Sequence, residues 1–285
     1  MRALVSVDWL RDHLGDPQLR VLDCTVHLVR SDDGTGYERR SGRTDWEKAH
    51  VPGSMFADLI HDLSDPDSAL SFMRPSAARF ASAMEALGVG DDSTVVLYDS
   101  RDAMWATRVW WLLHSFGFER AFVVDGGWKA WAAAGAPTTA EVTPRPTGGR
   151  FTASPRDDVF VDTAAVAAIV ADGHACLIDS LTPEQYRGDV QGYARAGHIP
   201  GAINVPARHL VDPDTGRFLS EGELRAHFAA PLASDTPIVT YCGGGIAATA
   251  DAFVLTMLGR DDVAVYDGSL SAWTADPAAP MATGD

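Results

Sequence analysis

Short apolar runs alternate with helical patterns along the whole chain of 285 residues. The apolar runs include residues 21–22, 95–98 and 121–124, which contain valine and are typical of short buried strands. Clear helical patterns occupy residues 77–87, 105–116, 163–171 and 222–228. Strands that alternate with helices predict an α/β fold, in which a mainly parallel sheet is covered by helices on both faces.

An internal repeat organises the chain. Each copy has an opening strand, a His-x-Pro-Gly turn, a further strand and a closing Asp-Gly stretch that ends in tryptophan. The copies carry these features at residues 20–24, 50–53, 94–99 and 125–131, and at residues 175–179, 198–201, 237–242 and 267–273. The repeat predicts two domains of one fold, residues 1–140 and 159–285. Residues 141–158, which contain prolines and glycines, are predicted to be the linker.

The first copy is longer than the second in its early half. The additional residues lie around 31–43 and 58–73, which are rich in Asp, Ser and Gly and are predicted to be loops. His50 and His198 recur in the two turns although only one copy has a cysteine nucleophile to serve, so we interpret both as structural. Three tryptophans at helical spacing are predicted to pack in the core or between the domains: Trp105, Trp110 and Trp111.

The stretch with the clearest chemistry lies in the second copy, at residues 238–250. A β-branched run leads to Cys242, three glycines follow, and a helical pattern begins at Ile246. Glycines allow main-chain N–H groups to converge on one point, and a helix N-terminus adds partial positive charge there. We therefore predict that Cys242 is a nucleophilic thiolate. The alternative is a buried structural cysteine, but a purely structural turn rarely needs three glycines.

Composition argues against several classes of partner. The formal net charge of −16 disfavours a nucleic-acid backbone or an anionic membrane as the main partner. No apolar run is long enough to span a bilayer, and the N-terminus lacks the pattern of a signal peptide. Three widely spaced cysteines, Cys24, Cys176 and Cys242, offer neither a disulfide framework nor a metal-binding pair. We expect a cytoplasmic protein in which Cys24 and Cys176 are inert packing residues.

Together these features resemble the tandem-domain rhodanese family of sulfurtransferases, which includes thiosulfate and 3-mercaptopyruvate sulfurtransferases. The resemblance rests on the two turns, the two closing stretches, the cysteine loop and the Arg-Val-Trp-Trp sequence at residues 108–111. It implies two rhodanese-like domains, each a parallel five-stranded sheet flanked by helices. It also implies that the first domain is catalytically silent, because Asp99 stands where the second domain has Cys242.

The resemblance further implies a two-step sulfur transfer that needs no cofactor and no metal ion. Cys242 takes the sulfane sulfur of a small anionic donor and becomes a persulfide. A thiol or cyanide acceptor, including a protein thiol, then removes that sulfur. The main-chain N–H groups implied to hold the persulfide belong to Gly243, Gly244, Gly245, Ile246 and Ala247.

Several positions depart from the family pattern, and they leave the donor undecided between thiosulfate and 3-mercaptopyruvate. Gly244 and Ala247 replace the serine and threonine of members that prefer mercaptopyruvate. Leu181 replaces an arginine that helps to bind the substrate carboxylate in the family. In the first copy Asp65 matches a family aspartate, whereas Phe72 replaces the histidine that the family is proposed to use in donor cleavage.

Two arginines remain as candidates for binding the donor anion. Arg187 matches a second family arginine and is the first candidate, with an exposed surface arginine as its alternative interpretation. Arg195, just before the second turn, is the other candidate.

Two other functions fit parts of the pattern. A cysteine phosphatase needs an arginine in its loop to clamp phosphate, and residues 242–248 contain no arginine or lysine, which argues against that class. A persulfide carrier or sulfur-sensing binding protein with poor turnover of small molecules is the alternative to an enzyme. The replacements at Leu181, Gly244 and Phe72 favour this alternative, because the family uses those positions on small donors.

Overall fold

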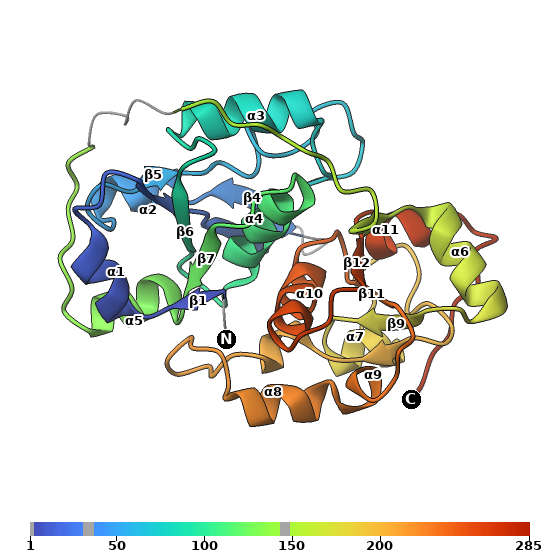
Figure 1. Cartoon of the computed structure of the whole chain (residues 1–285). Coiled ribbons are helices and arrows are strands. Elements are labelled where there is room, and N and C mark those ends of the chain that lie inside the picture. The colour runs from blue at the N-terminus through green and yellow to red at the C-terminus, as the bar shows by residue number, and fades with distance from the viewer. Residues whose placement is uncertain (1–2, 31–36, 143–148) are drawn as a thin grey trace.

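Two five-stranded sheets form the cores of the two halves of the chain (Figure 1). This computed structural model describes residues 3–30, 37–142 and 149–285. The paired strands of both sheets run parallel, and helices cover both faces of each sheet. The structure therefore confirms the α/β fold and the two similar sheets that the repeat predicts.

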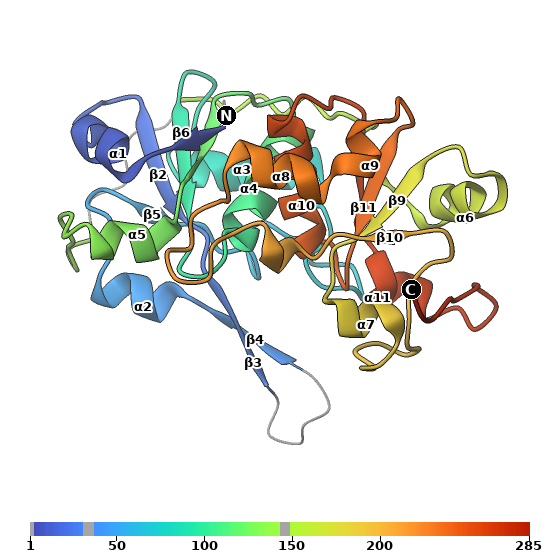
Figure 2. The same ribbon diagram turned by 90° about the horizontal axis from the view of Figure 1, so that it is seen from below.

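The first sheet lies in residues 4–124. Its spatial order is β1 (Leu4–Val5), β7 (Ala121–Val124), β6 (Thr94–Tyr98), β2 (Leu19–Asp23) and β5 (Met55–Phe56). Figure 2 shows three helices on one side of this sheet, α1 (Val7–His13), α2 (Arg43–Lys48) and α5 (Gly127–Ala133). Two more cover its other side, α3 (Ala77–Ala86) and α4 (Met104–Ser115).

The second sheet has the same arrangement. Its spatial order is β10 (Ile203–Asn204), β9 (Cys176–Asp179), β11 (Ile238–Tyr241), β12 (Val263–Tyr266) and β8 (Phe160–Val161). One side packs against α6 (Thr163–Asp172), α7 (Pro183–Arg187) and α11 (Ser269–Trp273). The other side carries the short 3-10 helix η1 (Ala207–His209), α8 (Glu221–His227), α9 (Ala229–Leu232) and α10 (Ala247–Met257). When the first sheet is followed from β5 and the second from β10, equivalent strands come in the same order, as expected of a repeat.

Side-chain caps explain where several helices begin. Ser76 accepts a hydrogen bond from a main-chain N–H in the first turn of α3, and Asp162 does so for α6. Before α8, Ser220 and Glu223 form a reciprocal capping box. By contrast, α10 begins without a side-chain cap, directly after the glycines of the Cys242 loop. The N–H groups of its first two residues, Ala247 and Ala248, donate no hydrogen bond within the described chain.

The two domains meet along α4 and α10, which lie between the sheets in both ribbon views (Figures 1 and 2). Trp110 of α4 packs edge-on against Phe253 of α10, with ring centroids 4.9 Å apart. Trp105 and Trp111 are buried as well, and one continuous apolar cluster contains residues of both domains. The packing role predicted for the three tryptophans is confirmed. The contact between the two domains is therefore closely packed and apolar.

One predicted loop contains regular structure. Residues 37–41 form β4 (Tyr37–Ser41), which pairs antiparallel with β3 (Val26–Arg30) in a hairpin that projects from the first domain (Figure 2). The prediction of a loop over 31–43 is therefore wrong for this part, and residues 31–36 lie outside the described residues. The polar sequence of β4 gave no strand signal, because its hydrogen bonds come from pairing with β3. Residues 58–73 contain no helix or strand, as predicted.

The described part of residues 141–158 packs along the first domain. Phe151 is buried against Phe80 and Phe118, and Thr152 hydrogen-bonds to Asp91. This segment therefore adds apolar area to the first domain before the chain enters β8.

The two repeated histidines have structural roles, as predicted. His50 is fully buried, and its Nδ1–H donates to the carbonyl oxygen of Trp46. His198 donates in the same way to Tyr186, and it stacks on that ring at 3.7 Å between centroids.

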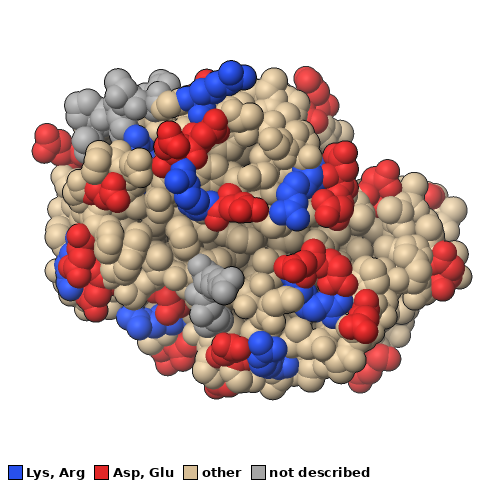
Figure 3. Space-filling model, in the orientation of Figure 1, with Lys and Arg blue, Asp and Glu red and all other residues tan. Residues whose placement is uncertain are grey.

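Acidic side chains are spread over the face of the molecule in Figure 3, with Lys and Arg between them. No helix in the described ranges has the length and apolar character needed to cross a membrane.

Candidate active site

Cys242 directly follows β11 and lines a cavity of about 540 Å³ between the two domains. Only 2% of the residue is exposed, so the cavity is its route to solvent. The second domain contributes residues of the loop 242–247 and residues 180–182 to the wall. The first domain contributes residues 69–73 and the start of α4. This is the carboxyl end of a central parallel strand, where α/β folds bind ligands.

Ser269 holds the Cys242 loop in place. Its Oγ accepts hydrogen bonds from the main-chain N–H groups of Cys242 and Gly245, both at 3.1 Å, and donates to the carbonyl oxygen of Tyr266 at 2.7 Å. The φ angle of Ser269 is +49°, which is unfavourable for a residue with a Cβ. The equivalent residue of the first domain is Gly127, with φ +51°. The second domain thus accepts backbone strain at the position whose hydroxyl fixes the loop.

The three glycines of the loop have different reasons for being glycine. Gly245 has φ +74°, and a Cβ there would lie 2.7 Å from Asp267 Oδ1. A Cβ at Gly243 would lie 1.5 Å from the Tyr193 hydroxyl. Gly244 is different, because its nearest neighbour would be Ser271 Oγ at 3.9 Å. A side chain therefore fits at Gly244 but not at the other two positions.

Most amides of the loop are available to an anion. Four of them donate no hydrogen bond to any residue that the structure describes: those of Gly243, Gly244, Ile246 and Ala247. The amide of Gly245 is engaged by Ser269, so its predicted part in holding a persulfide is not supported by its hydrogen bond. The helix N-terminus of α10 adds its partial positive charge beside these four groups.

The first domain shows how such a loop holds an anion. One carboxylate oxygen of Asp99 accepts from the amides of Arg101 and Ala103, at 2.8 and 3.3 Å. The other accepts from the amides of Trp105 and Ala106, at 3.0 and 2.9 Å. Burial raises the pKa of Asp99 to about 6, while these main-chain hydrogen bonds act in the opposite direction.

The loops of Asp99 and Cys242 have the same length, although the residue with a positive φ angle is Ala103 in the first and Gly245 in the second. Asp99 lies five residues before the start of α4, and Cys242 lies five residues before the start of α10. Arg101 and Ala103 therefore correspond to Gly244 and Ile246, whose amides donate no hydrogen bond within the described chain. A carboxylate oxygen stands two bonds beyond Cβ, as does the outer sulfur of a cysteine persulfide. The first domain thus shows that amides of a loop of this length can hold a charged group two bonds beyond Cβ.

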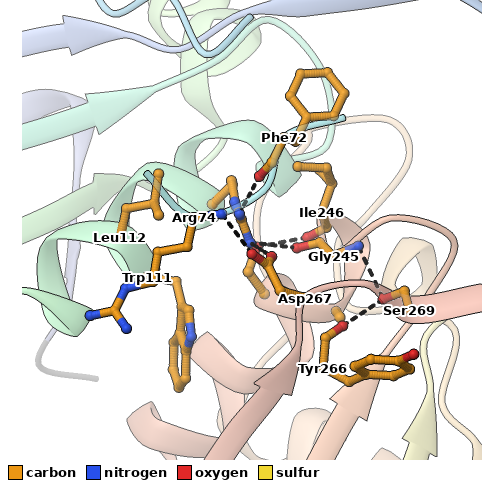
Figure 4. A network of polar contacts seen from close by, with 12 residues as sticks. Phe72, Arg74, Trp111, Leu112, Gly245, Ile246, Tyr266, Asp267 and Ser269 are labelled. Carbon is orange, nitrogen blue, oxygen red and sulfur yellow. Dashed lines mark hydrogen bonds and ion pairs between the residues drawn. The ribbon is translucent and has the colours of Figure 1, made fainter. Parts of the chain in front are cut away.

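Arg108 connects the first domain to this loop. It is fully buried on α4, and its Nη1 lies 2.7 Å from Asp267 Oδ1 and 3.1 Å from the carbonyl oxygen of Gly245. Its Nη2 donates to the carbonyl oxygen of Phe72. The main-chain N–H of Arg74 donates to Asp267 Oδ2 at 2.7 Å. Figure 4 shows Phe72, Gly245 and Asp267 converging on this network, which joins the cavity walls from both domains.

The positions that depart from the family pattern lie in the cavity wall. Leu181 and Phe72 line it from opposite domains, and Gly244 and Ala247 line it beside Cys242. Phe72 packs against Trp105, with ring centroids 5.4 Å apart. These replacements therefore alter the surface that a substrate meets.

A buried carboxyl group lies behind this wall and was not found from the sequence. Ser180, which lines the cavity, donates a hydrogen bond from Oγ to Asp251 Oδ2 at 2.6 Å. Asp251 is fully buried on α10, and burial raises the pKa of its carboxyl group well above the usual range. Asp179 at the end of β9 is also buried, which raises its pKa to about 6. A single acidic residue within a helical pattern gives no sequence signal for such burial.

Neither predicted anion-binding arginine lies in the cavity wall. Arg187 forms an ion pair with Asp189 at 2.9 Å, and Arg195 donates to main-chain carbonyls of residues 273–279. The basic residues that do line the cavity are Arg39 of the hairpin and Arg208 of η1. Neither belongs to a repeated motif, so the sequence gave no reason to select them.

The described residues contain no cluster of three His, Cys, Asp or Glu side chains that could hold a metal ion. Burial raises the pKa of the Cys24 thiol well above its usual range, and it raises that of Cys176 as well. Both thiols are therefore poor nucleophiles near neutral pH, in agreement with their predicted packing role.

The fold and this loop define a class of protein with two rhodanese-like domains in tandem. The family model described as Rhodanese-like domain matches residues 6–134 and 162–276. The chain belongs to the rhodanese family, as a tandem-domain sulfurtransferase related to thiosulfate and 3-mercaptopyruvate sulfurtransferases.

Relatives with different printed functions match almost the whole chain. The probable 3-mercaptopyruvate sulfurtransferase of Pseudomonas aeruginosa is 36% identical, covering 99% of this chain and 98% of that protein. The sulfur carrier protein TtuD of Thermus thermophilus is 34% identical, covering 99% and 97%. Rat (Rattus norvegicus) thiosulfate sulfurtransferase is 34% identical, covering 95% and 92%. The crystal structure of SseA from Escherichia coli superposes with a TM-score of 0.83 at 31% identity, covering 94% of this chain and 99% of that one.

Proposed function

We propose that this sulfurtransferase moves a sulfane sulfur from a small anionic donor to a thiol or cyanide through a persulfide on Cys242. The observation that carries the proposal is the contrast between the two loops. In the first domain four amides bind the Asp99 carboxylate. In the second domain the amides of Gly243, Gly244, Ile246 and Ala247 lie beside a cysteine and donate no hydrogen bond to any described residue.

The reaction needs only groups that this chain supplies. The Cys242 thiolate attacks the outer sulfur of thiosulfate, the sulfur–sulfur bond breaks, and sulfite leaves with the bonding electrons. The amides of Gly243, Gly244, Ile246 and Ala247 stabilise the charge on the outer sulfur of the persulfide. Cyanide or a thiolate then attacks that sulfur, and the Cys242 thiolate leaves unchanged. With 3-mercaptopyruvate the leaving group is the enolate of pyruvate, which takes up a proton.

A direct test is to incubate the protein with thiosulfate or 3-mercaptopyruvate and analyse its peptides by mass spectrometry. We expect the mass of one added sulfur on the peptide that contains Cys242. Cys242→Ser is expected to gain no sulfur, whereas Cys176→Ser is expected to load like the unchanged protein. Absence of sulfur on Cys242 with every donor would refute the proposal.

One observation favours a second candidate function, a persulfide carrier or sulfur-sensing protein that turns over small donors poorly. Leu181 stands in the cavity wall where the family has a carboxylate-binding arginine, and TtuD, a relative of 34% identity, is named a sulfur carrier. Fast steady-state turnover with small donors and acceptors would support the enzyme. Stoichiometric loading of Cys242 without turnover would support the carrier.

A further inference from the structure

The cavity beside Cys242 is larger and more apolar than a small inorganic anion requires. Its volume of about 540 Å³ lies within the range of sites that enclose drug-sized ligands, roughly 300–1,000 Å³. Apolar side chains from both domains line it, among them Leu70, Phe72, Met104, Trp105, Leu181 and Ile246. Such a wall favours a substrate that has an apolar part to bury.

Phe72 is held toward this cavity by its backbone. Its φ angle is +63°, an unfavourable value for a residue with a bulky side chain. The carbonyl oxygen of Phe72 accepts a hydrogen bond from the buried Arg108, which fixes this conformation. The ring then packs against Trp105 with its plane tilted by 56°. A strained backbone that is held in this way at a cavity wall indicates a functional position.

The positive charge in the cavity wall is small. Arg39 and Arg208 are its basic residues, and Arg39 already donates a hydrogen bond to Ser71. Arg208 makes no hydrogen bond or ion pair with any residue in the described ranges. Asp102 also lines the cavity and lies near enough to Arg208 to interact electrostatically with it. The loop amides can hold the sulfur that is transferred, and Arg208 faces the other end of the donor. One negative charge at that end is matched by Arg208, whereas a second would lose its hydration with little compensation.

We propose that the preferred sulfur donor is a monoanion with an apolar body, whose body packs on Leu181 and Phe72 and whose charged end lies near Arg208. This inference rests on the proposed function and specifies its substrate class. Organic thiosulfonates have this chemistry. The Cys242 thiolate attacks their outer sulfur, the sulfur–sulfur bond breaks, and a sulfinate anion leaves with the electron pair.

The test compares two donors that differ only in the apolar body. Methanethiosulfonate and benzenethiosulfonate carry the same reacting group, and cyanide is the acceptor for both. We expect the KM of benzenethiosulfonate to be about tenfold lower, because the phenyl ring buries apolar area that the methyl group lacks. Calorimetry of the unchanged protein with the two sulfinate products is expected to show the same order, with benzenesulfinate bound about tenfold more tightly. Equal KM values together with equal sulfinate affinities would overturn the inference.

Matched variants test whether the cavity wall causes the difference in KM between the two donors. Leu181→Ala is expected to reduce the ratio of the two KM values at least about threefold, chiefly by weakening the benzene donor. Val190→Ala serves as the control, because Val190 is exposed and lies outside the cavity wall. An unchanged ratio in a folded Leu181→Ala would overturn the part assigned to that residue. Sulfur loading of Cys242 at equal efficiency from both donors would refute this inference alone, whereas no loading from any donor would refute the proposed function.

Discussion

The Ser269 hydroxyl oxygen lies 3.1 Å from the main-chain nitrogen of Cys242, and it accepts that N–H. Because the same oxygen also accepts the N–H of Gly245, one side chain fixes the loop at both ends. The first domain has Gly127 at the equivalent position, which has no side chain to hold its loop in this way.

Two substitutions at Ser269 separate its hydroxyl from its backbone strain. Ser269→Gly and Ser269→Ala both remove the hydroxyl, and we expect both to slow sulfur loading of Cys242 about tenfold. Glycine tolerates the positive φ angle, so the glycine variant is expected to be about 1 kcal/mol more stable than the alanine variant. Mass spectrometry of loading and urea denaturation provide the two measurements. Loading at the original rate in both variants would show that the hydroxyl is dispensable.

Removing Arg108 is expected to destabilise the contact between the domains. Arg108→Met leaves Asp267 buried without its cationic partner, which costs about 3–5 kcal/mol. The double variant Arg108→Met with Asp267→Asn is expected to recover part of this loss, because the uncompensated charge is gone. Denaturation in urea measures both free energies of unfolding. A loss below about 1 kcal/mol in the single variant would contradict the structure.

The Asp99 carboxylate is expected to matter for stability rather than for chemistry. Asp99→Asn keeps the shape but turns an NH₂ group toward main-chain donors, and we expect a loss of about 2 kcal/mol. Sulfur loading of Cys242 should continue in the folded variant. Asp92→Asn is the control, since its side chain is almost fully exposed. Equal denaturation midpoints for the two variants would argue against the four hydrogen bonds.

Asp251 is expected to make stability depend on pH. Because burial raises its pKa in the folded protein, the folded state keeps this proton to higher pH than the unfolded chain does. Its contribution to stability is therefore complete below the unfolded pKa and is lost as pH rises toward the folded pKa. Asp251→Asn cannot ionise, so between about pH 5 and pH 8 its free energy of unfolding should fall less than that of the unchanged protein.

Thermal unfolding across this pH range measures the difference. Asp235→Asn removes an exposed carboxylate and serves as the control. Parallel curves for the unchanged protein and Asp251→Asn would mean that the Asp251 carboxyl group titrates normally.

Substitution of Arg208 is expected to weaken donor binding, whereas substitution of Arg187 is not. Arg208→Ala removes the cation in the cavity wall, and we expect the KM of an anionic donor to rise about tenfold. Arg187→Ala breaks an exposed ion pair outside the wall, and we expect a change below about twofold. Steady-state kinetics with one donor decides between them. A larger effect at Arg187 would restore the assignment that its sequence context suggested.

The repeat made most of the fold predictable. The strands β2, β6 and β7 are buried between helices, so their residues are mostly apolar. The apolar runs in the sequence therefore predict these strands. The polar strand β4 could not be predicted, because its stability comes from the partner strand and not from its own apolar pattern.

The candidate site was predictable only where the chemistry is local. The strand, cysteine and glycines of the loop are consecutive, so Cys242 could be placed before its surroundings were known. Arg208 and Asp251 are distant from Cys242 in the sequence and come near the site only in the folded chain. Ser269 does not stand in a motif that would have marked it as a contact of the Cys242 loop. Arg187 was selected by its neighbours in sequence, whereas the local ion pair with Asp189 holds it elsewhere.

Arg108 ties the half without the cysteine to the Cys242 loop. The residue belongs to the first domain, yet it binds the carbonyl oxygen of Gly245 and the carboxylate of Asp267 in the second. A truncated chain that retained only the cysteine-bearing half would lose this support and would expose the apolar side of α10 to water. The duplication thus left two halves that are no longer interchangeable or independent, and engineering of either one has to carry the other with it.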